Sequence, residues 1–166
     1  MTQNHIRRTL IWWLYGSAFA HFLVGALLPL LANQPLLEAY HRSVEAGFWL
    51  HAAPQAARAQ QIWWISLFGA TVQCLALWMG ALIYCGNRYR SSVAWAWLII
   101  GLILWAPQDM LISLQNQMQS HVWIDSAALL AMLPPLIWLW QHDRHKQQAI
   151  PQNTGNSGET VPKTKQ

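Results

Sequence analysis

The chain has 166 residues, and it is richer in Trp, Leu, Ile and Ala than a soluble domain of this length. Its net charge is +4, but the Lys and Arg residues fall in separated pairs beside apolar runs and form no basic stripe, which argues against nucleic-acid binding. The two cysteines, Cys74 and Cys85, lack zinc-ligand spacing. Because the predicted outer loops contain no pair of cysteines, the sequence also argues against disulfide-exchange chemistry. Composition therefore favours a helical protein embedded in lipid.

The first predicted element is a transmembrane helix over residues 9–32. These 24 residues contain no Asp, Glu, Lys or Arg. At about 1.5 Å rise per residue, they more than span a hydrocarbon core of about 30 Å. Because Arg7 and Arg8 precede the run, a signal peptide is the alternative, but the run is long and residues 30–32 make a poor cleavage site. We expect an uncleaved anchor.

A loop of 28 residues, 33–60, follows and is too long for a simple connection. Apolar side chains recur in it at helical spacing, at Leu37, Tyr40, Val44 and Phe48. Polar side chains occupy another face of the same helix, at Glu38, His41 and Glu45. We predict an amphipathic helix on the membrane surface or capping the bundle, with Pro54 ending or interrupting it before the second span.

Three more spans are predicted, over residues 61–85, 91–117 and 121–141, with short connections at 86–90 and 116–120 that make neighbouring helices antiparallel. Prolines within the spans are expected to kink and not to break them: Pro29, Pro107, Pro134 and Pro135. The predicted fold is an all-α membrane protein, a four-transmembrane-helix antiparallel bundle over residues 1–146 with an extracytoplasmic amphipathic helix between the first two spans. Residues 147–166 are predicted to be a disordered cytoplasmic tail.

Basic residues set the expected orientation. Eight of the ten Lys and Arg residues fall on the side of the two termini, and only Arg42 and Arg58 fall on the other. The positive-inside rule then places both termini in the cytoplasm. Aromatic belts agree, with the inner one at Trp12, Trp13, Trp95, Trp97, Trp138 and Trp140, and the outer one at Trp63, Trp64 and Trp123.

Small and polar residues form stripes on the first two spans. His21 lies at mid-depth, with Ser17 and Gly25 one turn away on either side. The second span carries a stripe that allows close backbone approach, at Ser66, Gly69, Gln73, Ala76 and Gly80. A hydrogen bond from His21 to Gln73 or to a backbone carbonyl is the expected role. Haem ligation would need a second deep His, which the spans lack, and no cofactor is expected.

Two acids interrupt the last two spans at comparable depth near the outer side. Asp109 lies in the third span, and Asp125 lies in the fourth with His121 one turn above it. Together with Gln108 they form a polar cluster that could move a proton or hold a cation. A structural hydrogen-bonded network is the alternative.

The amphipathic helix offers three possible metal ligands on one face, Glu38, His41 and Glu45. A Glu-x-x-His pair occurs in carboxylate-bridged metal bundles, but those contain two such pairs and this chain has one. A solvated network that includes a Glu38 to Arg42 helix pair is the alternative.

Three segments, EAYHRSVEAGFW (38–49), WAPQDML (105–111) and LPPLIW (133–138), resemble those of a family of small proteobacterial inner-membrane proteins of unknown function. Some of its members are labelled cell division protein. The resemblance covers roughly residues 10–144 and implies a bacterial inner membrane, but it identifies no functional residues.

Two functions stay open. The chain lacks a nucleophile elbow, a phosphate-binding glycine loop and a zincin helix, so we do not expect an enzyme. The first hypothesis is an accessory or scaffold protein whose partners, besides the lipid bilayer, are other membrane proteins or further copies of itself. The second is a small transporter or a ligand-, metal- or proton-binding protein that uses the outer Asp and His cluster.

Overall fold

The computed structural model describes residues 3–49 and 51–148, and the predicted tail lies almost entirely outside them. The described residues are mostly helical, and none of them lies in a strand. Helix bounds in chain order are α1 Gln3–Leu31, the short 3-10 helix η1 Pro35–Leu37, α2 Glu38–Phe48, α3 Gln55–Tyr89, α4 Ser92–Gln115 and α5 Gln119–Gln148. Among them, α1, α3, α4 and α5 are long and apolar enough to cross a membrane. The predicted all-α bundle is confirmed.

The helices extend beyond the predicted spans. Helix α3 continues through the predicted connection at 86–90 and ends only at Tyr89, where Arg90 adopts a left-handed conformation with φ of 51°. Ser91 then caps α4, because its hydroxyl accepts a hydrogen bond from the amide of Ala94. The turn between α3 and α4 is therefore shorter than predicted.

The long helices are unbroken at their prolines, as predicted, whereas Pro54 does not have its predicted role. Helices α1, α4 and α5 run without a break through the four prolines Pro29, Pro107, Pro134 and Pro135. Pro54 does not end α2, which stops at Phe48; it directly precedes α3, where its fixed φ suits the start of a helix.

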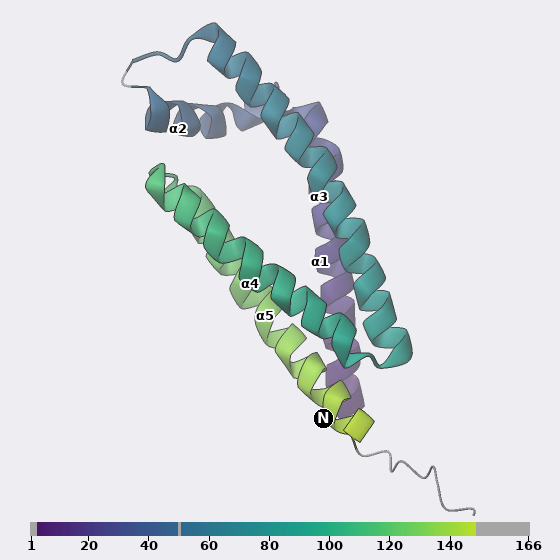
Figure 1. Ribbon diagram of the computed structural model, residues 1–166. Coiled ribbons are helices and arrows are strands. Elements are labelled where there is room, and N and C mark those ends of the chain that lie inside the picture. Colours follow the sequence, from purple (N-terminus) through teal and green to yellow (C-terminus); the bar gives the residue numbers. More distant parts are fainter. Residues whose placement is uncertain (1–2, 50, 149–166) are drawn as a thin grey trace, which may run out of the picture.

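The four long helices form two antiparallel pairs, α1 with α3 and α4 with α5. The pairs meet at the end where α1 begins and α5 ends, and they diverge toward the other end, where α2 lies across them (Figure 1). The hydrophobic core follows this arrangement. Its fully buried members include Leu14, Ile83 and Leu136 from three different helices, and all of them lie in the half where the pairs meet.

Glycines let α1 and α3 approach closely. A Cβ atom built on Gly25 would lie 2.7 Å from the carbonyl oxygen of Gly69, and one built on Gly69 would lie 2.7 Å from the carbonyl oxygen of Gly25. Only glycine fits at such a contact. The predicted close approach is confirmed at these two residues, whereas Gly80 has no atom within 4 Å of a built Cβ.

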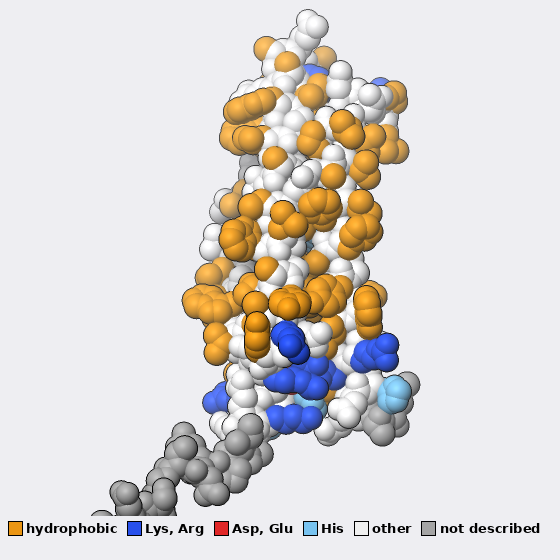
Figure 2. Space-filling model, turned by 90° about the vertical axis from the view of Figure 1, so that its right-hand side faces the viewer, with side chains coloured by type: hydrophobic (Ala, Val, Ile, Leu, Met, Phe, Trp, Pro, Cys, Tyr) orange, Lys and Arg blue, Asp and Glu red, His pale blue; other side chains and the backbone are white. Residues whose placement is uncertain are grey.

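The outer surface of the helices is apolar over most of its length. Figure 2 shows hydrophobic side chains along the helices and Lys and Arg side chains gathered mainly at the end near the N-terminus, called here the basic end. Most predicted belt residues are exposed, among them Trp12, Trp97 and Trp123. Trp95 differs, because it is fully buried among the helices and does not face an interface.

Candidate functional sites at the two ends of the bundle

Helix α2 is fastened to α3 by an ion-pair network. The Arg58 guanidinium donates to both acids of α2, with Nη1 lying 2.8 Å from Oε2 of Glu38 and Nη2 lying 2.9 Å from Oε2 of Glu45. Glu38 also accepts from Arg42 at 2.9 Å, so the predicted helix pair is confirmed. Arg58 lies 13 residues beyond Glu45, so helical spacing could not identify it as the partner.

These ion pairs lower the pKa of both carboxyls. Hydrogen bonds from Arg58, and then from Arg42, lower the pKa of Glu38 from 4.5 to about 2. The hydrogen bond from Arg58 likewise lowers the pKa of Glu45. A carboxyl whose pKa is lowered by folding stabilises the folded arrangement above its unfolded pKa, and this stabilisation is lost as the pH falls through the folded value.

We therefore expect α2 to loosen between about pH 4.5 and pH 2 and to stay docked at neutral pH. The measurement is the mobility of a spin label at the exposed residue Ser43, in a chain whose two native cysteines are replaced by Ser. Arg58→Gln should make the label mobile already at pH 7 and remove the acid transition. Equal mobility of the label at pH 7 and pH 2.5 in the chain with Arg58 intact would contradict this interpretation.

His41 points away from the two acids and into the junction with α1. It is 2% exposed, and its Nε2 donates to the carbonyl oxygen of Ala32 at 2.7 Å. Its Nδ1 is buried without a partner in the described part of the chain. The structure thus does not gather Glu38, His41 and Glu45 as a ligand set, and the described residues contain no group of three His, Cys, Asp or Glu side chains that could hold a metal.

The predicted outer cluster lies beneath α2. Asp125 of α5 is 4% exposed, and its Oδ2 has no partner among the described residues. Asp109 of α4 and His121 of α5 lie within electrostatic range of it. Tyr40 of α2 reaches this cluster, because its hydroxyl lies 3.2 Å from Nε2 of His121. Partial burial, and then the charge of Asp109, raises the pKa of Tyr40.

Other predicted site residues lie apart from this cluster or at its edge. Gln108 is exposed. His21 is exposed too, and its Nδ1 donates to the carbonyl oxygen of Ser17 at 2.7 Å, which is the predicted backbone alternative to a bond with Gln73. Gln73 instead packs against Gly25, since its Cγ lies 2.9 Å from a Cβ built there.

Sequence reasoning missed the most buried ionic group, Asp143 of α5. Its carboxylate accepts from Arg7 of α1 through Nε at 3.2 Å and Nη2 at 3.0 Å, and from Nε1 of Trp95 of α4 at 3.0 Å. Arg7 also donates to the side chain of Asn87 of α3 at 2.9 Å. All four long helices therefore meet at this ion pair, and both of its side chains are almost fully buried.

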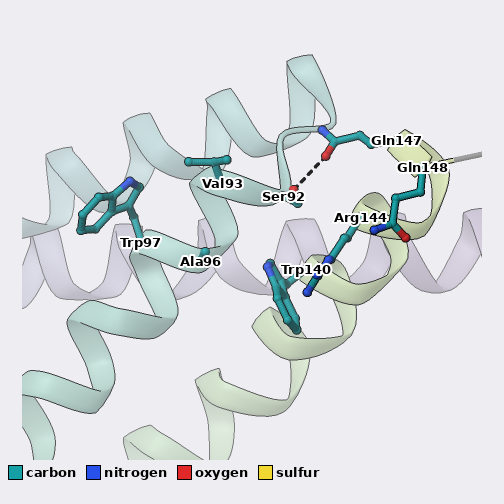
Figure 3. Close-up of a pocket in the computed structure, with 8 residues that line it drawn as sticks. All are labelled: Ser92, Val93, Ala96, Trp97, Trp140, Arg144, Gln147 and Gln148. Carbon is teal, nitrogen blue, oxygen red and sulfur yellow. Dashed lines mark hydrogen bonds between the residues drawn. The ribbon is translucent and has the colours of Figure 1, made fainter. Parts of the chain in front are cut away.

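Two hollows flank this ion pair at the basic end. One, of about 510 Å³, lies between α4 and α5, where the Arg144 guanidinium stacks over the Trp140 ring at 5.1 Å (Figure 3). Gln147 closes its end, because it accepts from the Ser92 hydroxyl at 2.8 Å. The other, of about 370 Å³, lies beside α1 and includes Arg7, Arg8 and Arg90. Neither hollow is lined by Asp109 or Asp125.

No protein-family model, curated protein or solved structure matches the chain. The interpretation of its function therefore depends on this geometry.

Proposed function

We propose that the chain is a non-enzymatic accessory or scaffold protein whose membrane-spanning helices bind other membrane proteins. The observation that supports this proposal is the incomplete packing of the two helix pairs. They share a core only in the half near the basic end, while large apolar side chains stay exposed on every long helix in the diverging half, for example Leu30, Phe68, Leu111 and Ile124.

The physical reason is that lipid does not drive apolar helix faces together. Helices in a bilayer associate through van der Waals packing and hydrogen bonds, so uncovered faces remain available to another helix. The two pairs are connected through the Arg7 and Asp143 ion pair at one end and through α2 at the other. Gly47 of α2 also lies against Met118 in the turn between α4 and α5. Two helix pairs that are connected at both ends and apart between them can each present a helix face to a partner.

We also propose that this frame lies in a bacterial inner membrane with both termini in the cytoplasm. The gathering of Lys and Arg side chains at the basic end supports this orientation through the positive-inside rule (Figure 2). A green fluorescent protein fused after Gln166 should fluoresce, and alkaline phosphatase inserted after Ser43 should be active. The reverse pattern would overturn the orientation.

Photo-crosslinking tests the scaffold function. A benzophenone amino acid is incorporated in cells at exposed positions in the half where the helix pairs diverge, namely Leu27, Leu30, Leu111 and Leu114. The control positions are exposed residues near the basic end, Val93 and Trp97. We expect a discrete crosslinked product at the first group and none at the controls. A product of twice the chain mass would identify a second copy as the partner. Absence of a product at all four test positions would contradict the proposal.

Substitution of the outer acids separates this function from the alternative. The double variant Asp109→Asn with Asp125→Asn should leave the crosslinked product unchanged if the chain acts as a scaffold, because the apolar faces carry the binding. Loss of the product would count against it.

One observation favours a second candidate, a proton- or cation-binding transporter. Asp125 is buried beneath α2, and its Oδ2 has no partner among the described residues. Because an acid within a membrane costs free energy, such residues commonly have a function. In this case the purified chain should conduct protons or a monovalent cation across liposomes, and Asp125→Asn should abolish the flux. A flux no greater than that of protein-free liposomes would exclude this candidate.

A further inference from the structure

The hollow beside α1 combines a polar, basic part with an apolar part. Arg7, Arg8 and Arg90 contribute to the first, and Trp12 and Tyr15 contribute to the second. It lies at the basic end, between the first turns of α1 and the turn that connects α3 to α4 (Figure 1). Trp and Tyr side chains prefer the level of lipid headgroups, which places this hollow at the membrane interface.

The charges around this hollow do not cancel. Arg7 is engaged by Asp143 and Asn87, so its charge is compensated. Arg90 is half-exposed, and its Nη1 lies 3.8 Å from Oδ1 of Asp143, which is a longer contact than those of Arg7. Arg8 is exposed, and its side chain has no hydrogen-bond partner among the described residues. Arg7 and Arg90 thus share the carboxylate of Asp143, and Arg8 has no acidic partner among the described residues, which leaves an excess of two positive charges.

The excess positive charge and the planar guanidinium donors indicate an anionic ligand, and the interfacial depth of the hollow indicates a lipid headgroup. Guanidinium groups bind phosphate through paired hydrogen bonds, and basic pockets between transmembrane helices bind anionic headgroups. We propose that this hollow binds the phosphate group of an anionic phospholipid through Arg8 and Arg90, while Arg7 is held in place by Asp143. The acyl chains then lie along α1, where Trp12 and Phe19 are exposed.

A soluble phosphate compound offers the same chemistry as a lipid headgroup. The apolar side chains of the hollow favour the lipid, because the rings of Trp12 and Tyr15 can contact acyl chains, which a free anion does not have. The experiment therefore includes both sources.

The test measures lipid binding to the full chain in detergent micelles by native mass spectrometry. Dioleoyl phosphatidylglycerol is titrated against dioleoyl phosphatidylcholine, which carries the same acyl chains and no net charge. We expect the first phosphatidylglycerol to bind at least tenfold more tightly. Arg8→Gln and Arg90→Gln should each weaken it about fivefold, and should leave phosphatidylcholine unaffected.

Arg144→Gln is the matched control. It removes one exposed Arg from the same end of the protein but from the other hollow, and it should leave the binding of phosphatidylglycerol within twofold. Arg8→Lys and Arg90→Lys keep the charge, so they should bind with intermediate affinity and remain informative if a Gln variant fails to fold.

Three results would overturn the proposal. The first is an equal loss of binding in Arg144→Gln, which would indicate a general attraction to the basic end. The second is equal affinity for the two lipids. The third is displacement of phosphatidylglycerol by millimolar inorganic phosphate in an Arg8-dependent manner, which would assign the hollow to a soluble anion.

Discussion

Replacing Asp143 by Leu is expected to lower the free energy of unfolding by about 3–5 kcal/mol, the range for breaking a buried ion pair by removing one partner. Arg7 would keep its charge in a buried position, and Trp95 would lose the acceptor of its indole N–H. The loss would affect all four long helices at once. Unfolding in mixed detergent micelles, followed by Trp fluorescence, measures it.

Two further variants distinguish a broken ion pair from a simple change in packing. The double variant Arg7→Leu with Asp143→Leu should recover much of the lost stability, because it removes both buried charges. Arg144→Ala, next to Asp143 but exposed, should lower stability by no more than about 1 kcal/mol, through the lost cation–π contact with Trp140. Equal destabilisation by the single and double Leu variants would contradict a dominant role for the unpaired charge.

The Asp143 cluster shows where sequence reasoning reached its limit. Asp143 stands among His142, Arg144, His145 and Lys146, which is the pattern of a solvated helix end. A signal for its burial was nevertheless present in the spacing. Met132, Leu136, Leu139 and Asp143 recur at intervals of four, three and four, and Arg7, Ile11, Leu14 and Ala18 do the same on α1. Each charged residue therefore continues a buried apolar stripe.

The four long apolar helices were predictable because each depends on local composition. A run of apolar residues long enough to cross lipid specifies a helix whatever its neighbours are. The close contact of Gly25 with Gly69 was partly predictable for the same reason, since small residues at helical spacing mark an interface. Which helices pair, and at which end the pairs separate, depends on contacts between distant residues and could not be predicted from periodicity.

The end of the bundle at α2 illustrates the same limit in its polar residues. Helical spacing placed Glu38, His41 and Glu45 together, but spacing says nothing of which side chains neighbouring helices supply. Arg58 donates hydrogen bonds to both carboxylates, and the Ala32 carbonyl accepts one from His41. Potential metal ligands therefore act as contacts that fasten α2.

The structure as a whole is a pair of helical hairpins connected at both ends. Buried charge connects them at the basic end, where the hydrophobic core lies as well. At the other end α2 contacts the second hairpin through Tyr40 with His121 and through Gly47 with Met118, and half-exposed ion pairs with Arg58 hold α2 to α3. We expect the connection at α2 to be the weaker one, because the ion pairs that hold α2 to α3 are partly exposed and such pairs contribute little stability. Acid or loss of Arg58 should therefore release α2 without unfolding the hairpins.

The second large effect is expected from Gly69→Ala, which should destabilise the chain by about 1–3 kcal/mol. Its new Cβ would lie 2.7 Å from the Gly25 carbonyl oxygen and from Cδ of Pro29, and neither atom belongs to a flexible side chain. Helices α1 and α3 would have to separate to admit it. Unfolding in mixed detergent micelles gives the free energy of each variant.

Gly80→Ala is the matched control on the same helix. A Cβ at Gly80 meets nothing within 4 Å, so this variant should be neutral or slightly stabilising through the better helix propensity of Ala. Gly25→Ala should resemble Gly69→Ala, and the double variant should cost less than the sum of the two, because one separation of the helices relieves both contacts. Two results would mean that α1 and α3 are not in close contact at Gly25 and Gly69. One is equal stability of Gly69→Ala and Gly80→Ala, and the other is full additivity of the effects of Gly25→Ala and Gly69→Ala.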